Sequence, residues 1–204
     1  MIPAIILAAG RSSRMGRPKP LLPLAGHETF LSRLVRVLRE GGADEVVVVL
    51  GCEAGTVRAA IEAARLPVRV VENPRYADGQ LSSLVAALGV VDRPGVTGVL
   101  VTLVDVPLVS AATVRAVLDA YRRTNAPIVR PARDGRHGHP VLFDRRVFGE
   151  LRQADRSVGA KAVVRAHGPQ VLDVPVEDEG AFLDIDTPEE YERLSARTLD
   201  RPGR

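Results

Sequence analysis

The first 124 residues alternate four times between a short apolar run and an amphipathic segment with helical spacing. Strand–helix alternation of this kind predicts an α/β fold with a mostly parallel sheet and right-handed crossovers. The core would consist of Val, Leu, Ile and Ala, because 46% of the residues are hydrophobic and only 3% are aromatic. Such a composition suits a buried parallel sheet. We expect strands at residues 2–8, 45–50, 67–71 and 96–104, and helices at 29–40, 53–65, 81–91 and 110–124.

The pattern is less regular in the second part of the chain. The sequence predicts short strands at residues 128–131, 141–143, 170–174 and 182–185, helices at 146–153 and 157–167, and a polar turn at 134–140. A final helix should begin at Thr187, because threonine is a favoured N-cap, Pro188 suits the first helical position and Glu190 completes a capping box. No repeat or linker interrupts the chain, so we expect one domain over residues 1–198 and a frayed tail at 199–204.

Charge, cysteine and hydropathy patterns argue against several classes of protein. The net charge is only +3, and no arginine-rich run is interleaved with aromatic residues, so nucleic-acid binding has little support. No apolar stretch reaches about 18 residues, the length that spans a membrane. The single cysteine, Cys52, rules out an internal disulfide and suits a reducing compartment. The chain passes straight into a strand without a leader pattern, and we expect a soluble, cytoplasmic protein.

Residues 7–22 form a cationic loop punctuated by glycines, directly after the first apolar run. A buried strand that runs into such a loop presents backbone N–H groups and positive charge to phosphate. Lys19 stands between two prolines, and only it and Lys161 are lysines among 28 basic residues. This choice favours a compact point charge over the planar fork of arginine. The spacing matches neither the P-loop nor the G-x-G-x-x-G fingerprint, which disfavours a dinucleotide oxidoreductase.

Aspartates follow the apolar runs at places where open α/β sheets bind ligands. Asp105 ends one run, and Asp184 and Asp186 alternate on an extended segment, so the latter two should face the same side. Together they would make an oxygen-rich site for Mg²⁺. Two simpler interpretations remain: Asp105 could cap the helix at 110–124, although Ser110 already suits that role, and Asp186 could complement the dipole of the last helix.

Two histidines, His137 and His139, flank a glycine in the polar turn. An H-x-H pair could hold zinc, but no third ligand is evident. We therefore favour ordinary surface histidines over a zinc site.

The loop sequence resembles a known signature. Leu7-Ala8-Ala9-Gly10-x-Ser12-x-Arg14-Met15-Gly16-x-x-Lys19-x-Leu21-Leu22 is similar to the opening motif of nucleotidyltransferases with a mononucleotide-binding α/β fold. Within that group it most resembles the molybdenum-cofactor branch, the molybdopterin cytidylyltransferases and guanylyltransferases. Weaker matches follow in the order of that branch and extend the resemblance over about residues 2–195: Asn73-Pro74, Gly79-Gln80-Leu81-Ser82-Ser83-Leu84, Asp105-x-Pro107, Gly138-His139-Pro140 and Asp184-x-Asp186-Thr187-Pro188.

This resemblance implies a Rossmann-like three-layer α/β/α fold of the nucleotide-diphospho-sugar transferase type. It implies that Arg14 and Lys19 hold the triphosphate, that Asp105 and Asp186 bind Mg²⁺, and that His139 lies near the acceptor. Arg14, Lys19 and Asp105 would be the catalytic residues. Alanine at position 9, where guanylyltransferases of the branch carry glycine, favours CTP over GTP. The nucleotide-binding residues would be Leu7, Ala8, Ala9, Gly10, Ser12, Arg14, Gly16, Lys19, Gly79 and Ser83.

The expected activity is Mg²⁺-dependent transfer of CMP from CTP to a phosphorylated acceptor, with molybdopterin favoured and a molybdoenzyme as a candidate recipient of the product. Residues 154–161 depart from the branch, because they lack the first glycine of its glycine-aspartate-x-glycine stretch. The acceptor therefore stays open. A methylerythritol phosphate, a sugar phosphate, or a non-catalytic role as a nucleotide-binding regulator are the alternatives.

Overall fold

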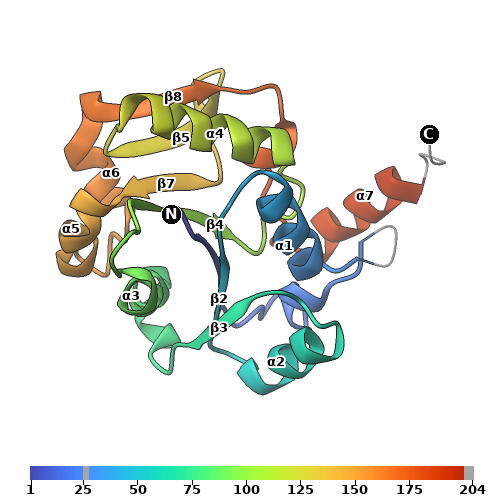
Figure 1. Ribbon diagram of the computed structural model, residues 1–204. Coiled ribbons are helices and arrows are strands. Elements are labelled where there is room, and N and C mark those ends of the chain that lie inside the picture. The colour runs from blue at the N-terminus through green and yellow to red at the C-terminus, as the bar shows by residue number, and fades with distance from the viewer. Residues whose placement is uncertain (25–27, 200–204) are drawn as a thin grey trace.

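The computed structural model describes residues 1–24 and 28–199, which form a central sheet between two layers of helices (Figure 1). Four parallel strands lie side by side in the order β3 (Arg69–Glu72), β2 (Val46–Leu50), β1 (Ala4–Ala8) and β4 (Gly98–Leu103). Their side chains are mostly Val, Ile, Leu and Ala, and every residue of β1 and β2 is buried. This confirms the predicted α/β fold and its mostly parallel sheet.

The sheet continues beyond β4 with strands of both directions. β7 (Val141–Asp144) is antiparallel to both of its neighbours, β4 and β5 (Ile128–Arg133). β5 in turn pairs in parallel with β8 (Val171–Pro175) and in an antiparallel hairpin with β6 (Arg136–His137). The antiparallel strand β7 thus separates the parallel half of the sheet, β1 to β4, from the half with mixed strand directions.

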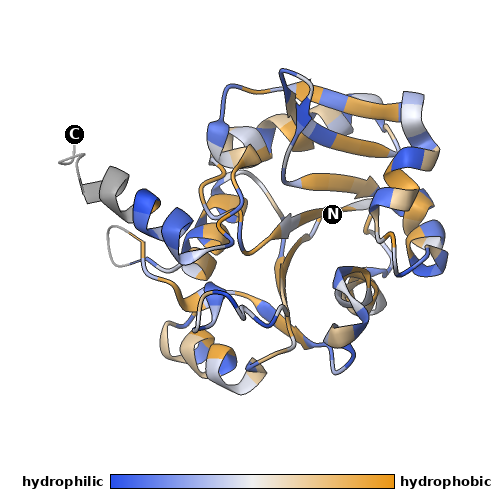
Figure 2. Ribbon diagram, turned by 180° about the vertical axis from the view of Figure 1, so that it is seen from behind, coloured by the Kyte–Doolittle hydropathy of each residue, from blue (hydrophilic) through white to orange (hydrophobic). Residues whose placement is uncertain are grey.

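Helices cover both faces of the sheet. One face packs against α1 (Phe30–Glu40), α2 (Ala54–Ala63) and α4 (Ala111–Thr124). The other packs against α3 (Gln80–Val91), α5 (Phe148–Gln153) and α6 (Lys161–His167). The last helix, α7 (Pro188–Leu199), extends away from the body, and Figure 2 shows it far more hydrophilic than the strands. Within the described ranges, no helix is both long and apolar enough to cross a bilayer.

Two predicted helix caps are confirmed. Ser110 accepts a hydrogen bond from Thr113 N at the start of α4. Glu190 accepts hydrogen bonds from the backbone N–H groups of Asp186 and Thr187, while Thr187 Oγ1 accepts one from Glu190 N, which completes the capping box. Local sequence spacing was sufficient for both.

Four predictions of secondary structure were wrong. Residues 182–185 form no strand; Glu179–Phe182 is a 3₁₀ turn, and an extended segment follows. The helix predicted at 157–167 begins only at Lys161, because Gly159 has a φ of +76°. The turn at 134–140 contains β6, because positive φ at Asp134 and Gly135 closes a tight hairpin. Leu199, placed in the tail, belongs to α7; the rest of that predicted tail, residues 200–204, lies outside the described residues.

Candidate active site

A cavity of about 400 Å³ lies at the carboxyl ends of β1 and β4 and beside the segment that follows β3. Parallel α/β sheets bind ligands at this edge. Gly16, His139 and Asp184 lie outside the lining, as far as the structure describes it. The other residues predicted to bind nucleotide or metal come together there: Leu7, Ala8, Ala9, Gly10, Ser12, Arg14, Lys19, Gly79, Ser83, Asp105 and Asp186.

The loop after β1 is folded by contacts within itself. Ser12 has a φ of +48°, its carbonyl accepts a hydrogen bond from Met15 N at 2.9 Å, and its Oγ accepts one from Lys19 N at 3.0 Å. Gly16 has a φ of +64°, a conformation that glycine adopts without strain. The structure thus gives Gly16 a role in shaping the loop, which explains how it can matter without lining the cavity.

Lys19 bridges two of the predicted metal ligands. Its Nζ lies 2.5 Å from Asp186 Oδ1 and 3.5 Å from Asp105 Oδ2. The lysine side chain is only 12% exposed, so solvent screens this contact less than it would screen a surface pair. Asp186 pairs with Lys19, while the side chains of Thr187 and Glu190 cap the last helix.

Asp105 is fixed through its backbone, and its carboxylate has a shifted pKa. Its carbonyl accepts a hydrogen bond from Ile185 N at 2.8 Å, which joins the two acidic segments. Burial raises the pKa of Asp105 above its ordinary value, Lys19 opposes this shift, and Asp184 and Asp186 add to it. Burial and the charge of Asp186 likewise raise the pKa of Asp184. Burial is thus the main cause of both shifts, and the neighbouring carboxylates add to it.

The acidic pair fits a divalent cation that is completed by other ligands. Asp105 Oδ1 is buried and has no hydrogen-bond partner within the described chain, which leaves one carboxylate oxygen free to coordinate. No group of three or more His, Cys, Asp or Glu side chains among the described residues could hold a metal alone. Mg²⁺ typically takes one or two carboxylates and completes its shell with water and substrate phosphates, and Asp105 with Asp186 supplies that donor set.

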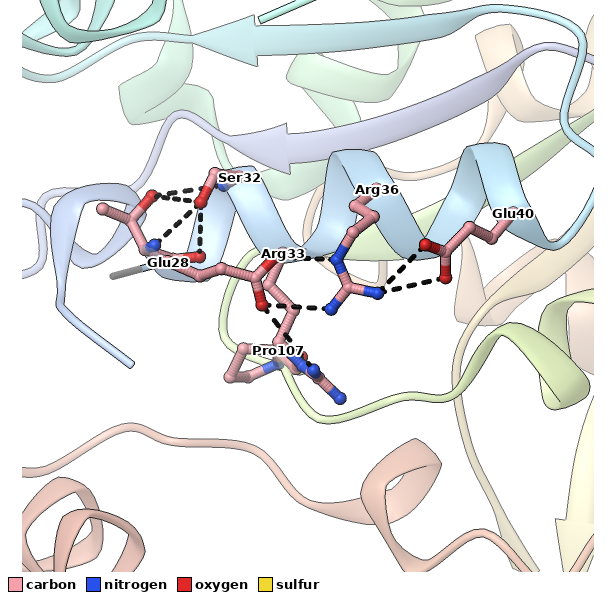
Figure 3. Close-up of polar contacts among 7 residues, drawn as sticks. Glu28, Ser32, Arg33, Arg36, Glu40 and Pro107 are labelled. Carbon is pink, nitrogen blue, oxygen red and sulfur yellow. Dashed lines mark hydrogen bonds and ion pairs between the residues drawn. The ribbon is translucent and has the colours of Figure 1, made fainter. Parts of the chain in front are cut away.

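Contacts from α1 hold the segment that follows Asp105. Figure 3 shows Arg33 and Arg36 on one side of α1. Arg33 Nε donates a hydrogen bond to Pro107 O at 2.9 Å, while Arg36 bonds Glu28 and Glu40. Arg33 thus ties the Asp105–Pro107 turn to a rigid helix, a contact that sequence spacing did not reveal.

A buried asparagine holds together the wall of the cavity beyond β3, in segments that the family resemblance had already marked. Asn73 is buried, and its Nδ2 donates to Ser82 Oγ at 2.8 Å and to Ser83 Oγ at 3.0 Å. All three residues belong to sequence segments that resemble the family, and of the three only Ser83 lines the cavity. Sequence reasoning assigned no binding role to the remaining lining residues, which are Ser13, Pro20, Tyr76, Gln80, Leu103 and Val104.

His139 lies beside the cavity. Its backbone N–H donates to Ala181 O at 2.8 Å, and its ring lies near Val101 O. Burial lowers the pKa of His139, whereas the charge of Asp105 opposes that shift, so the imidazole tends to be neutral. His137 is placed differently: its Nε2 lies 3.3 Å from Asp173 Oδ2. The two histidines thus have different partners. His137 is exposed, as expected of a surface histidine, whereas His139 is mostly buried, so that expectation was wrong for His139.

Comparisons with known proteins agree with this geometry. The sequence model of the MobA-like NTP transferase domain matches residues 4–171. A nicotine blue oxidoreductase from Paenarthrobacter nicotinovorans is 34% identical, over 95% of this chain and 96% of that protein. A probable molybdenum cofactor guanylyltransferase from Opitutus terrae is 32% identical, over 92% of each chain.

Among solved structures, Rv0371c from Mycobacterium tuberculosis H37Rv superposes with a TM-score of 0.81 at 36% identity, over 96% of this chain and 98% of that one. A second structure of Rv0371c, in complex with manganese, gives a TM-score of 0.73 at 35% identity over the same shares. The chain therefore belongs to the family of MobA-like NTP transferase domains, and it is a nucleotidyltransferase.

Proposed function

We propose that this nucleotidyltransferase transfers CMP from CTP to the phosphate of molybdopterin, with Mg²⁺, and releases pyrophosphate. The observation that carries the proposal is the arrangement of Lys19, Asp105 and Asp186 in one cavity at the carboxyl edge of the sheet. The cavity thus combines a lysine ammonium that can bind phosphate with two carboxylates that can bind a metal ion.

The proposed reaction is a substitution at phosphorus. An oxygen of the acceptor phosphate forms a bond to the α-phosphorus, and the bond from that phosphorus to the oxygen bridging the β-phosphate breaks. The chain needs to hold the two reactants in line and to neutralise charge. Lys19 and Arg14 would do this for the α-phosphate and the departing pyrophosphate. Backbone N–H groups of the loop after β1 would orient the nucleotide.

Asp105 and Asp186 would hold Mg²⁺, whose presence would neutralise phosphate charge. The unpartnered Oδ1 of Asp105 supports this assignment, as does the manganese complex of Rv0371c. Because Lys19 now occupies the space between the carboxylates, its ammonium must exchange partners when a cation binds. Nucleotide phosphates offer it that alternative partner.

The proposed choice of base and the proposed choice of acceptor depend on different residues. Ala9 lines the cavity and favours CTP through its resemblance to cytidylyltransferases, although the relative from Opitutus terrae is named for guanylyl transfer. The acceptor would lie toward His139, where residues 154–161 depart from the family pattern. Methylerythritol phosphate and sugar phosphates are therefore tested alongside molybdopterin, and a molybdoenzyme remains a candidate recipient.

A second candidate function follows from the relative in Paenarthrobacter nicotinovorans. Its name describes an oxidoreductase acting on nicotine blue, and its similarity covers nearly the whole chain. The G-x-G-x-x-G fingerprint is absent from the loop after β1, which disfavours dinucleotide binding here. Reduction of nicotine blue with NADH or NADPH tests this alternative directly.

The deciding experiment measures pyrophosphate release with Mg²⁺ and CTP, GTP or ATP, each with and without molybdopterin. We expect release that requires both CTP and molybdopterin and that ceases with EDTA. Pyrophosphate release with a sugar phosphate or with methylerythritol phosphate, but not with molybdopterin, would identify that compound as the acceptor instead. Nucleotide binding without turnover on any acceptor would instead support a regulator, and nicotine blue reduction without pyrophosphate release would contradict the proposal.

A further inference from the structure

The two ends of the cavity differ in charge. Arg14, Lys19, Asp105 and Asp186 gather around the loop after β1 and the end of β4. The segment after β3 contributes an end lined by Tyr76, Gly79, Gln80 and Ser83, none of which is charged. β3 and β4 lie on opposite sides of β1 in the sheet. A nucleotide bound across this edge would place its phosphates toward the charged end and its base toward the uncharged end.

Tyr76 is fixed at the uncharged end by tight packing. A Cβ added to Gly51 would lie 2.6 Å from Tyr76 Cβ, 2.7 Å from Tyr76 Cγ and 2.8 Å from Ala9 O. The absent side chain of Gly51 therefore lets Tyr76 and Ala9 approach each other. Cys52 N donates a hydrogen bond to Ala9 O at 3.1 Å, which holds the end of β1 in this arrangement.

Further contacts restrain Tyr76 from outside the cavity. The guanidinium of Arg11 lies 6.0 Å from the ring centroid, within the range of a cation–π contact, and Arg11 is not among the described lining residues. Tyr76 N donates to Asn73 O at 3.2 Å, and Asn73 N donates to Leu50 O at 2.8 Å. The main chain of Tyr76 is thus tied to the end of β2, and its ring, packed against Gly51 and Arg11, forms a preformed wall of the cavity.

We propose that Tyr76 determines which size of base the site accepts: its ring closes the uncharged end so that a pyrimidine fits and a purine is excluded. The inference rests on the proposed binding of a nucleoside triphosphate in this cavity. It adds to Ala9 a second residue, one that acts through bulk and aromatic contact with the base.

The test compares the wild type with Tyr76→Ala and Tyr76→Phe by calorimetric titration with CTP, UTP, GTP and ATP in Mg²⁺. The wild type should bind the pyrimidine nucleotides more tightly. In Tyr76→Ala the affinity ratio of CTP to GTP should fall by about tenfold, a typical share of discrimination by an apolar pocket wall. Tyr76→Phe keeps the ring and should keep the ratio. Tyr76→Leu replaces Tyr76→Ala if thermal unfolding shows that the smaller variant is not folded.

The failure of the two proposals can be distinguished. If the wild type binds no nucleoside triphosphate, both the proposed function and this inference are contradicted. If the wild type binds CTP and GTP equally, or if truncation of Tyr76 leaves the ratio unchanged, Tyr76 is not the determinant, while nucleotidyl transfer stands. A ratio lost in Tyr76→Phe would assign selectivity to the hydroxyl and overturn the role of the ring.

Discussion

Two aspartates lie at opposite ends of β4 and differ in how their oxygens are used. Asp144 pairs with Gly98 at the start of β4. It accepts hydrogen bonds from Tyr121 Oη at 2.8 Å and from Arg146 N and Nε at 2.8 Å each. Asp105 follows the end of β4, and its Oδ1 has no partner among the described residues. Both oxygens of the Asp144 carboxylate thus accept hydrogen bonds within the protein, whereas one oxygen of Asp105 is left for a ligand.

The pKa values differ accordingly. Burial alone would raise the pKa of Asp144, but the hydrogen bonds from Arg146 and Tyr121 outweigh it and hold the pKa below its ordinary value. Burial raises the pKa of Asp105, and Lys19 does not offset it fully. Satisfied carboxylates stabilise the folded chain, whereas unsatisfied ones cost stability that binding can recover. The contrast suggests that substitutions at the two positions should separate stability from activity.

The largest effect should come from Asp105→Asn. Loss of the metal-binding charge should lower kcat roughly 10³-fold and remove Mg²⁺ dependence of the residual rate. Asp144→Asn is the matched control, because it makes the same chemical change at the other end of β4 and should retain kcat. Pyrophosphate release over a Mg²⁺ titration measures both. Normal metal dependence in Asp105→Asn would exclude Asp105 as a ligand.

Lys19→Met should lower kcat by roughly 10²–10³-fold, as loss of a transition-state charge contact does. It should also raise the affinity for Mn²⁺ without nucleotide, measured by electron paramagnetic resonance, because the Nζ no longer neutralises Asp105 and Asp186. Arg14→Met removes one charge from the same cavity and should change Mn²⁺ affinity less. Equal effects of the two variants on Mn²⁺ binding would show that Lys19 does not compete with the metal.

Asp144→Asn should lower the free energy of unfolding by about 1–3 kcal/mol at pH 7, the cost of disturbing buried hydrogen bonds. Because the folded pKa of Asp144 lies below its ordinary value of 3.8, its contribution is present above that pH and is lost as the pH falls through the folded pKa. The difference between wild type and variant in urea unfolding should therefore shrink in acid. A constant difference from pH 7 to pH 3 would contradict the role of the ionised carboxylate.

Tyr121→Phe should have the smallest effect, about 1 kcal/mol, since it removes one hydroxyl that donates to Asp144 and Thr97. Burial and the neighbouring Asp144 raise the pKa of Tyr121 from 10.0 to about 12. Its contribution is complete below pH 10 and is lost as the pH rises through about 12. In urea unfolding, the advantage of the wild type over the variant should be smaller at pH 11 than at pH 8, and an equal advantage at both would contradict this role of the hydroxyl.

The first four strand–helix units could be predicted from the sequence, because their apolar spacing is local. The region after α4 could not be predicted as well. Gly159, Asp134 and Gly135 impose turns through positive φ, which periodicity does not reveal. The segment at 182–185 is a short apolar run like a strand, yet Ile185 N donates its hydrogen bond to Asp105 O outside any strand of the sheet. A short apolar run alone cannot distinguish a strand from an extended segment.

For the site, the order of residues along the chain indicated which side chains were available. A strand ending in a glycine-punctuated loop, a single lysine between prolines, and aspartates after apolar runs all follow from order along the chain. The tertiary structure alone decided which of these meet. Lys19 and Asp186 form an ion pair although they are 167 positions apart in the sequence. Tyr76 and Ala9 lie close together because Gly51, which lies against both, has no side chain. Hydrogen-bond satisfaction also depends on packing, which is why Asp105 and Asp144 look equivalent in sequence but carry opposite pKa shifts.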